Sequence, residues 1–180
     1  MHSDETLFQR VRAGDIAAFD ALYERYELRI FAYLRAFTGS RQDAEELLHD
    51  AFLAALKTEH APLAEGAFRG LLYRVARNLA SNRRRSARRH ARLLASAPEA
   101  APAPAGADVA IERRELQIAL EDAVGRLPDS LGELYHLRSS GLSYEQIATV
   151  VEAPLGTVKS RMHQMVNVLR EELKPWVAPK

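Results

Sequence analysis

The sequence predicts an all-α fold of two small helical domains joined by a flexible linker, the C-terminal domain being a helix-turn-helix. Apolar residues recur at every third or fourth position in long segments of both halves, which is the period of an amphipathic helix. Between the halves, ASAPEAAPAPAGADVA is a Pro/Ala-rich stretch of the kind that forms linkers. We therefore expect domains at residues 1–94 and 111–180, with the linker at residues 95–110.

Composition narrows the class of protein. With 180 residues, 47% of them hydrophobic and 27% charged, the chain can form one or two globular domains. It has no cysteine, which excludes disulfides, cysteine-ligated zinc and thiol redox sensing, and its six histidines lack metal-ligand spacing, so we expect no metal and no cofactor. The acidic N-terminus precedes no apolar run, so we expect no signal peptide, no membrane insertion and a cytoplasmic location.

Charge is distributed unevenly behind a formal net charge of +1. Residues 66–98 contain no carboxylate, and six arginines fall within residues 83–92. Such a run repels itself in solution, and a polyanion relieves the repulsion while its condensed counterions are released. A solvated, partly disordered charge run is the alternative; a DNA-reading helix elsewhere in the chain would favour a nucleic acid as the partner.

Four helices are expected in the first domain. Ser3 and Ser40 can cap the first and third helices, and the second covers residues 16–37. The fourth begins near Ala67, after a loop at residues 58–66, and continues into the arginine run. The inward-facing apolar positions of the last three helices are Phe19, Leu22, Tyr26, Ile30, Leu34, Phe37, Ala44, Leu47, Leu48, Ala51, Phe52, Leu56, Phe68, Leu71, Leu72, Val75 and Leu79.

The outer face of the third helix is acidic. It presents Asp43, Glu46, His49 and Asp50. The positive end of the helix dipole would stabilise Asp43 and Glu46 without any function. Asp50 lies in the middle of the helix, where it gains little from the terminus, so the dipole explains this carboxylate less well.

The second domain is expected to hold two supporting helices and then the helix-turn-helix. The supporting helices cover residues 111–124 and 128–139. Ser143 is a natural N-cap for a short helix, and Gln146, three residues on, completes a capping box. A proline-containing break and a longer helix follow, and Pro175 is expected to stop that helix and leave a short tail. The apolar stripe of the longer helix is Leu155, Val158, Met162, Met165 and Leu169.

The face opposite this stripe is polar and has no carboxylate. At about 100° per residue, Ser160, His163 and Asn167 lie opposite the stripe, flanked by Lys159 and Gln164. A short helix, a turn and a long helix with hydroxyl, imidazole, amide and ammonium groups are typical of a DNA-reading helix-turn-helix. An ordinary helical hairpin with a solvated face is the alternative.

Together these features resemble the extracytoplasmic-function (ECF) group of bacterial sigma factors. The second region of that family is similar to AFDALYERYELRIFAYL, DAEELLHDAFLAAL and FRGLLYRVARNLASNRRR, in this order. Its fourth region is similar to LP, LR, GLSYEQIA and PLGTVKSR in the second domain. The resemblance covers nearly the whole chain, and this combination of motifs is much more specific than a helix-turn-helix alone.

The resemblance implies a function. Sigma factors bind core RNA polymerase, direct it to specific promoters and promote duplex opening, and an anti-sigma factor commonly controls them. They are not enzymes, so no catalytic residue is expected. The residues implied to bind core polymerase are Asp43, Glu46, His49 and Asp50.

The resemblance also implies two contacts with promoter DNA, one with the duplex and one with the melted single strand. The loop at residues 58–66 would form part of a pocket for an unstacked base of the minus-ten element. The residues implied to hold the minus-ten region are Arg74, Arg77, Asn78, Asn82, Arg83, Arg84 and Arg85. In the minus-thirty-five element, the residues implied to read bases are Ser160, His163 and Gln164, and those implied to hold phosphates are Arg138, Tyr144, Thr157, Lys159 and Arg161.

Two other classes of protein stay open. A stand-alone helix-turn-helix transcriptional regulator would need a sensing or dimerisation domain in the N-terminal half, where the sequence shows neither a ligand-pocket signature nor a heptad seam. An enzyme acting on nucleic acid would need paired carboxylates, a Gly-rich phosphate loop or a nucleophile motif, and the sequence shows none of these.

Gln164 and Val166 stand where basic residues are common in sigma factors, which leaves the preferred promoter sequence open.

Overall fold

The chain is all-helical throughout the part that the structure describes. The computed structural model describes residues 2–58, 64, 66–94 and 111–177, and every regular element within these ranges is an α-helix. This confirms the predicted fold class. The expected linker at residues 95–110 and most of the loop at residues 58–66 lie outside the described residues.

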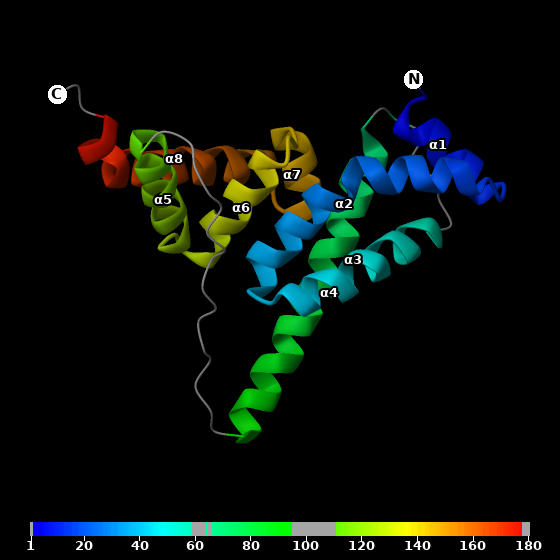
Figure 1. Ribbon diagram of the computed structural model, residues 1–180, viewed down its shortest axis with the longest axis horizontal. Helices are drawn as coiled ribbons and strands as arrows, with labels where there is room; N and C mark the ends of the chain where they lie inside the picture. Colours follow the sequence, from blue (N-terminus) through cyan, green and yellow to red (C-terminus); the bar gives the residue numbers. More distant parts are fainter. Residues whose placement is uncertain (1, 59–63, 65, 95–110, 178–180) are drawn as a thin grey trace. The chain divides into compact units, whose positions relative to one another are not determined.

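Contacts divide the chain into two compact units. The first contains α1 to α4, and the second contains α5, α6, α8 and most of α7 (Figure 1). Within the first unit, the second half of α4 extends beyond the other three helices (Figure 1). The helices are α1 (Asp4–Arg12), α2 (Ile16–Thr38), α3 (Arg41–Leu56), α4 (Ala67–Leu94), α5 (Ile111–Gly125), α6 (Asp129–Ser139), α7 (Tyr144–Val151) and α8 (Leu155–Val177).

Side-chain caps define the helix starts of the N-terminal unit. The hydroxyl of Ser3 accepts a hydrogen bond from the Thr6 amide at 3.2 Å, and that of Ser40 accepts one from the Asp43 amide at 3.2 Å. Each bond satisfies an amide that has no partner within its own helix. Before Ser40 the chain turns at Gly39, whose φ of 73° suits a residue without a Cβ atom. Both predicted caps are therefore confirmed.

The core of the N-terminal unit lies between α2, α3 and α4. Most of the predicted inward positions are buried, while Phe19, Phe37, Leu56, Val75 and Leu79 are only half-buried. Aromatic rings fill much of this core, as the edge-on contact of Tyr33 and Tyr73 at 5.5 Å illustrates. The buried residues of these three helices that the pattern did not select are Ala18, Tyr33, Ala55, Gly70, Tyr73, Ala76 and Ala80.

Helix α1 is fixed to the unit by its first turn. Asp4 forms an ion pair with Arg25 at 2.7 Å and accepts a hydrogen bond from the Tyr26 hydroxyl. Glu5 is buried and accepts a hydrogen bond from the Phe68 amide at 3.4 Å, at the start of α4. Burial raises the pKa of Tyr26 to about 12, so this hydroxyl keeps its proton and remains a donor. The two acidic residues thus connect α1 to α2 and α4.

The C-terminal unit confirms the predicted capping box. The Gln146 amide donates to the Ser143 hydroxyl at 3.2 Å, and the Ser143 amide donates to the Gln146 side-chain oxygen at 2.9 Å. Helix α7 ends at Val151, and Glu152 follows in the left-handed region with a φ of 54°. The short helix, three-residue connection and long helix follow one another as the sequence predicted.

The expected end of the last helix at Pro175 is wrong. Helix α8 continues through Pro175 to Val177, so Trp176 belongs to the helix and not to a tail. A proline lacks the N–H that would bond the carbonyl four residues earlier, but only two residues of α8 follow Pro175, so few further hydrogen bonds depend on the turn that it disturbs.

Candidate functional site

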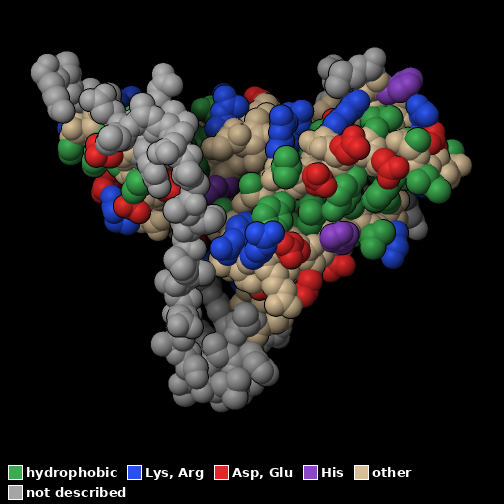
Figure 2. All heavy atoms as spheres, in the orientation of Figure 1, with side chains coloured by type: hydrophobic (Ala, Val, Ile, Leu, Met, Phe, Trp, Pro, Cys, Tyr) green, Lys and Arg blue, Asp and Glu red, His purple; other side chains and the backbone are tan. Residues whose placement is uncertain are grey.

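The acidic surface of the N-terminal unit lies on α3. Glu46, His49 and Asp50 are exposed, and Asp43 is half-buried. On the face shown in Figure 2, hydrophobic side chains run along the contact between α2 and α3, with acidic side chains on both sides. One helix turn beyond Asp50, Leu53 is 52% exposed. The four residues predicted to bind polymerase therefore share a surface that continues into an apolar position.

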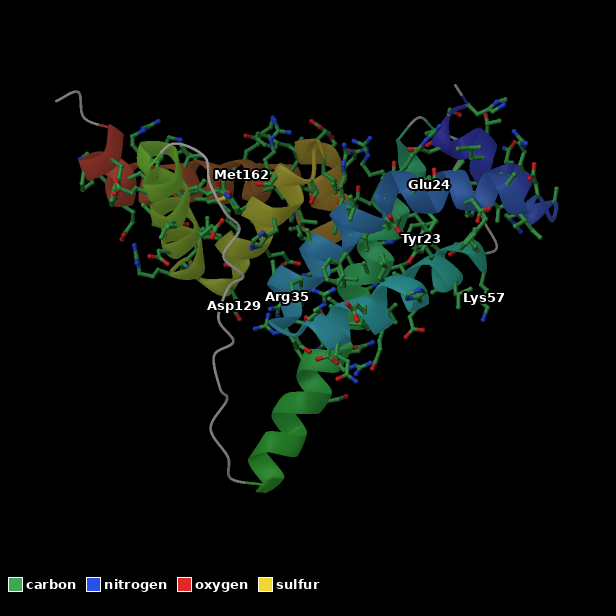
Figure 3. All side chains as sticks on the ribbon, in the orientation of Figure 1. Tyr23, Glu24, Arg35, Lys57, Asp129 and Met162 are labelled. Carbon is green, nitrogen blue, oxygen red and sulfur yellow. The ribbon has the colours of Figure 1, made fainter. Side chains whose placement is uncertain are left out.

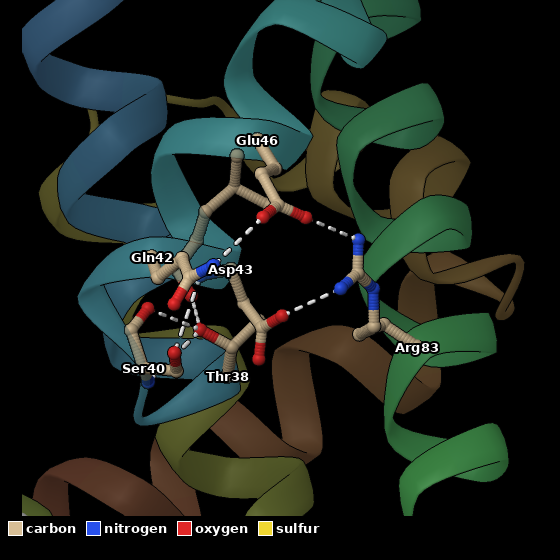
Figure 4. Close-up of polar contacts among 7 residues, drawn as sticks. Thr38, Ser40, Gln42, Asp43, Glu46 and Arg83 are labelled. Atoms are coloured by element: carbon tan, nitrogen blue, oxygen red, sulfur yellow. Dashed lines mark hydrogen bonds and ion pairs between the residues drawn. The ribbon is translucent and has the colours of Figure 1, made fainter.

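Arg83 of α4 forms ion pairs with two residues of this surface (Figure 4). Its Nη1 lies 2.7 Å from Asp43 Oδ1, and its Nη2 lies 2.9 Å from Glu46 Oε2. The Arg83 bond lowers the pKa of Glu46, and a hydrogen bond from Gln42 contributes to the same shift. The Glu46 bond in turn raises the pKa of Arg83. A residue predicted to hold DNA is thus paired with two residues predicted to hold polymerase.

His49 is held in one orientation by its neighbours. Its Nδ1 donates to the Glu45 carbonyl at 2.9 Å, which leaves Nε2 as an acceptor facing the Tyr23 hydroxyl at 3.5 Å. Tyr23 lies between α2 and α3, with its ring 4.8 Å from that of Phe52 (Figure 3). The sequence pattern did not select Tyr23. Its spacing of four from Phe19 is the signal that could have placed it beside the surface of α3.

Of the four residues predicted to bind polymerase, Asp50 has the fewest hydrogen bonds and ion pairs with the rest of the described chain. It is exposed, and no hydrogen bond or ion pair joins its carboxylate to another residue that the structure describes. A carboxylate in the middle of a helix, away from the dipole ends, contributes little to stability when it is solvated. Asp50 therefore keeps a solvated carboxylate that a partner can reach, although Arg83 lies near enough to interact with its charge.

Helix α4 separates the residues predicted to hold the minus-ten region. At about 100° per residue, Arg74, Asn78, Asn82 and Arg85 fall on one face, because they are spaced by four, four and three positions. Arg77 and Arg84 flank this face, and the Arg84 guanidinium lies 5.1 Å from the centre of the Phe37 ring. By the same geometry, Arg83 points about 180° away from Arg74. The helix thus spreads six of the seven residues over an arc of about 160° and places Arg83 outside that arc.

Helix α8 has one buried and one exposed face. Val158, Met162, Met165 and Leu169 are buried, while Leu155 is half-buried. The polar residues predicted to meet the minus-thirty-five element all lie outside this buried stripe. Of these, Thr157 is half-buried, and the exposed ones are Lys159, Ser160, Arg161, His163 and Gln164.

Asn167 orients the imidazole of His163. The Asn167 side-chain nitrogen donates to His163 Nε2 at 3.0 Å, so Nδ1 carries the ring proton and can donate to a further acceptor. The Asn167 oxygen faces Arg170 at 3.5 Å. Lys159, Ser160 and Gln164 supply ammonium, hydroxyl and amide groups beside this ring. This set can hydrogen-bond to base edges and phosphate oxygens.

Arg138 and Tyr144 form a small cluster where α7 begins. Arg138 donates to the Leu142 carbonyl at 2.8 Å, and its guanidinium lies 5.4 Å from the centre of the Tyr144 ring. Arg138 stays exposed, and a guanidinium has five N–H donors, so this side chain retains donors for a phosphate. The structure thus brings together two of the residues predicted to hold phosphates.

Within the described ranges, no group of three or more His, Cys, Asp or Glu side chains is arranged to hold a metal ion. In the same part of the chain, no helix combines the length and the apolar character that crossing a membrane requires.

Known proteins resemble this chain in sequence and in fold. Residues 22–90 match the family model for sigma-70 region 2. The RNA polymerase sigma-H factor of Pseudomonas aeruginosa is 31% identical, with 96% of this chain and 94% of the relative covered. The ECF RNA polymerase sigma-E factor of Haemophilus influenzae is also 31% identical, with 96% of each chain covered.

Two solved structures share the fold. One is a complex of CnrH with the cytosolic domain of CnrY; it has a TM-score of 0.65 and 20% identity and covers 97% of this chain and 99% of the other. The second is the sigma factor RpoE of Bartonella quintana in complex with the anti-sigma factor NepR. It has a TM-score of 0.68 and 22% identity, and the match covers 87% of this chain and 96% of the other. The resemblance drawn from the sequence motifs is confirmed by the end-to-end match to the two relatives. The chain belongs to the extracytoplasmic-function family of RNA polymerase sigma factors.

Proposed function

We propose that this chain binds core RNA polymerase, directs it to specific promoters and promotes duplex opening for transcription initiation. The observation that carries the proposal is the match over nearly the full length of two proteins named RNA polymerase sigma factors. The distribution of charge supports it, because an acidic surface on α3 and a carboxylate-free arginine helix suit two different partners. A sigma factor needs both a protein contact and a nucleic-acid contact.

The α3 surface is the proposed contact with polymerase. Asp50 offers a solvated carboxylate, and Asp43, Glu46 and His49 surround it with further polar groups. Complementary charges across a protein interface give specificity and raise the association rate, so the polymerase side of this contact should be cationic. Leu53, one turn further along α3, adds an apolar contact at the edge of this surface.

The face of α4 that carries Arg74, Asn78, Asn82 and Arg85 is the proposed contact with the minus-ten region. Guanidinium groups bind backbone phosphates, and amides hydrogen-bond to unpaired base edges. Holding an unstacked base costs a few kcal/mol, which contacts of this kind must offset. The predicted pocket loop at residues 58–66 lies mostly outside the described residues and stays a prediction.

The exposed face of α8 is the proposed reader of the minus-thirty-five element. Ser160, His163 and Gln164 would read base edges in the major groove. The residues proposed to hold phosphates, and so to position the helix without specifying sequence, are Arg138, Tyr144, Thr157, Lys159 and Arg161.

Control by an anti-sigma factor is part of the proposal. The sigma factor RpoE of Bartonella quintana is solved with an anti-sigma factor and shares this fold. We expect such a partner to cover the polymerase-binding and DNA-binding surfaces until a signal removes it. The protein would then act in the cytoplasm as a non-enzymatic initiation factor, because its polymerase and promoter partners reside there.

The rival is a stand-alone helix-turn-helix regulator, which would bind duplex DNA and recruit polymerase only indirectly. Both named relatives match the N-terminal unit as well as the C-terminal one, which supports the sigma factor over this rival. The discriminating property is direct binding to core polymerase in the absence of DNA.

A titration of the fluorescently labelled full chain with purified core polymerase tests the proposal. We expect tight binding by the wild type, and we expect Asp50→Lys to weaken it by roughly tenfold or more, because the change reverses a charge at the contact. Glu121→Lys makes the same charge change on an exposed residue of α5 and should have no effect. A wild type that does not bind core polymerase would exclude the sigma-factor function, and equal losses in both variants would mean that α3 is misassigned.

A further inference from the structure

Arg83 does not share the surroundings of the other arginines of α4. It points about 180° from Arg74, away from the face that unites the other predicted DNA contacts. Its side chain is 39% exposed and faces two carboxylates of α3. A phosphate that approached this guanidinium would come within a few ångströms of Asp43 and Glu46, and the like charges would repel it. Arg83 is therefore poorly placed to hold DNA.

The guanidinium instead fixes two side chains of the acidic surface. Asp43 and Glu46 lie three residues apart on α3, and one guanidinium binds both, at 2.7 and 2.9 Å (Figure 4). Gln42 binds the second Glu46 oxygen at 3.2 Å, so both oxygens of that carboxylate have donors. Without these bonds, two half-exposed acidic side chains would sample several rotamers.

Two consequences of this pairing oppose each other. Ordering the carboxylates in advance reduces the conformational entropy that a partner must remove on binding, which strengthens the contact. Neutralising part of the charge of the carboxylates weakens their attraction to a cationic partner. The surface stays acidic, because Asp43, Glu46 and Asp50 carry three negative charges against the one positive charge of Arg83, and Asp50 lies outside the pairing. The pairing therefore orders two carboxylates and still leaves the surface acidic.

We propose that Arg83 is a positioning residue of the polymerase-binding surface, holding Asp43 and Glu46 in place, and that it is not a DNA contact. This inference rests on the proposed function, since it assigns Arg83 to the polymerase contact of a sigma factor. It divides the arginine run by function. Arg74 and Arg85 serve the nucleic acid, and Arg83 serves the protein partner.

Matched variants of the full chain separate the two roles. Arg83→Gln removes the pairing, and Arg85→Gln makes the same change two residues away on the DNA-facing side of α4. We expect Arg83→Gln to weaken core polymerase binding by about threefold to tenfold, the effect of freeing one or two side chains. The assembled holoenzyme should bind forked promoter DNA as the wild type does. Arg85→Gln should give the reverse pattern.

A double-mutant cycle tests whether Arg83 acts through its partners. In a background of Asp43→Asn and Glu46→Gln, Arg83→Gln should cause no further loss of polymerase affinity, because the side chains it orders have already lost their charge. Arg83→Lys keeps the charge but cannot span both carboxylates with a planar fork, so it should restore only part of the affinity. Circular dichroism and thermal unfolding establish that each variant is folded. If Arg83→Gln does not fold, the measurements are made on Arg83→Lys in its place.

Several outcomes would overturn the inference. Unchanged polymerase affinity in Arg83→Gln would mean that Arg83 does not contribute to the contact. Increased affinity would mean that Arg83 weakens the contact by neutralising the carboxylates. A loss of DNA binding equal to that of Arg85→Gln would return Arg83 to the DNA face, and an undiminished effect in the neutralised background would mean that it does not act through Asp43 and Glu46. These results presuppose wild-type binding to core polymerase, so failure of the wild type to bind is a separate result that concerns the proposed function.

Discussion

His163 lies on the exposed face of α8 with its proton position set by a neighbour. Because Asn167 donates to Nε2, the ring offers an Nδ1 donor, which suits an acceptor on a base edge such as a purine N7. Gln164 beside it offers both a donor and an acceptor. Together with Ser160, these two residues are where sequence preference should reside, while the neighbouring cations contribute affinity without preference.

We predict that His163→Ala and Gln164→Ala each change the order of preference among promoter variants, with discrimination altered by about 1–3 kcal/mol at the position that each residue reads. Lys159→Ala should weaken all promoters alike and reduce the salt dependence of binding by about one unit in a log–log plot. Holoenzyme binding to a panel of minus-thirty-five variants at several salt concentrations measures both effects. A uniform loss in His163→Ala would make that residue a phosphate contact.

His136 gives the C-terminal unit a pH dependence. Burial lowers the pKa of this histidine in the folded chain below its ordinary 6.5. As pH falls below about 6.5, the unfolded chain takes up the proton first, so the folded state loses stability until its own lower pKa is reached. We predict a lower urea midpoint at pH 5.5 than at pH 7.5, followed through the fluorescence of Trp176, the one tryptophan of the sequence. His136→Phe should flatten this difference; a wild-type midpoint that is constant or rises at low pH would contradict it.

Residue-level predictions from the sequence succeeded where the partner is local. The caps Ser3, Ser40 and Ser143 each bind an amide three residues ahead, so the information lies within a few positions of the sequence. The partners of Arg83 lie 37 and 40 positions away, on another helix. The sequence analysis grouped Arg83 with the DNA contacts; helical spacing could have shown that it leaves the face of Arg74, but only the packing of α3 against α4 identifies the carboxylates that it meets.

At the scale of elements, α7 depends on its capping box. It has eight residues, which are too few for a helix to be stable in isolation. The hydrogen bonds at its ends therefore contribute a large share of its stability. We predict that Ser143→Ala lowers the stability of the C-terminal unit by about 1 kcal/mol, the usual cost of an N-cap, in urea unfolding followed by Trp176 fluorescence. Ser139→Ala, at the exposed end of α6, is the control and should change little. Equal midpoints for wild type and Ser143→Ala would show that packing alone holds α7.

Hydrophobic periodicity, capping residues and breaks together located the helices that the structure describes to within a few residues, because each long helix buries one stripe. Periodicity did not predict the features that depend on the packing of several helices against one another. Tyr33, Tyr73 and the small residues Ala76 and Ala80 are buried because three helices surround them, which a single stripe does not anticipate. Pro175 was expected to stop α8, yet the helix accommodates it in its last turn.

At the scale of the whole molecule, the chain distributes its surfaces between two units. The N-terminal unit carries an acidic surface on α3 and an arginine face on α4, and the C-terminal unit carries the polar face of α8. The motifs that predicted the family are spread over both units, which explains why the end-to-end comparison and the sequence agree. The linker at residues 95–110, which we predict to be flexible, would let polymerase set the distance between the two DNA contacts.

Run-off transcription with purified core polymerase is the most direct test of the central claim. The template is promoter DNA from the protein's own genome, and reactions with and without the protein are compared. We predict that the protein produces transcripts of defined length from a subset of promoters, that Asp50→Lys abolishes most of this activity, and that Glu121→Lys retains it. Transcription that does not depend on the protein, or no transcript from any promoter despite a folded chain and active core polymerase, would contradict its function as a sigma factor.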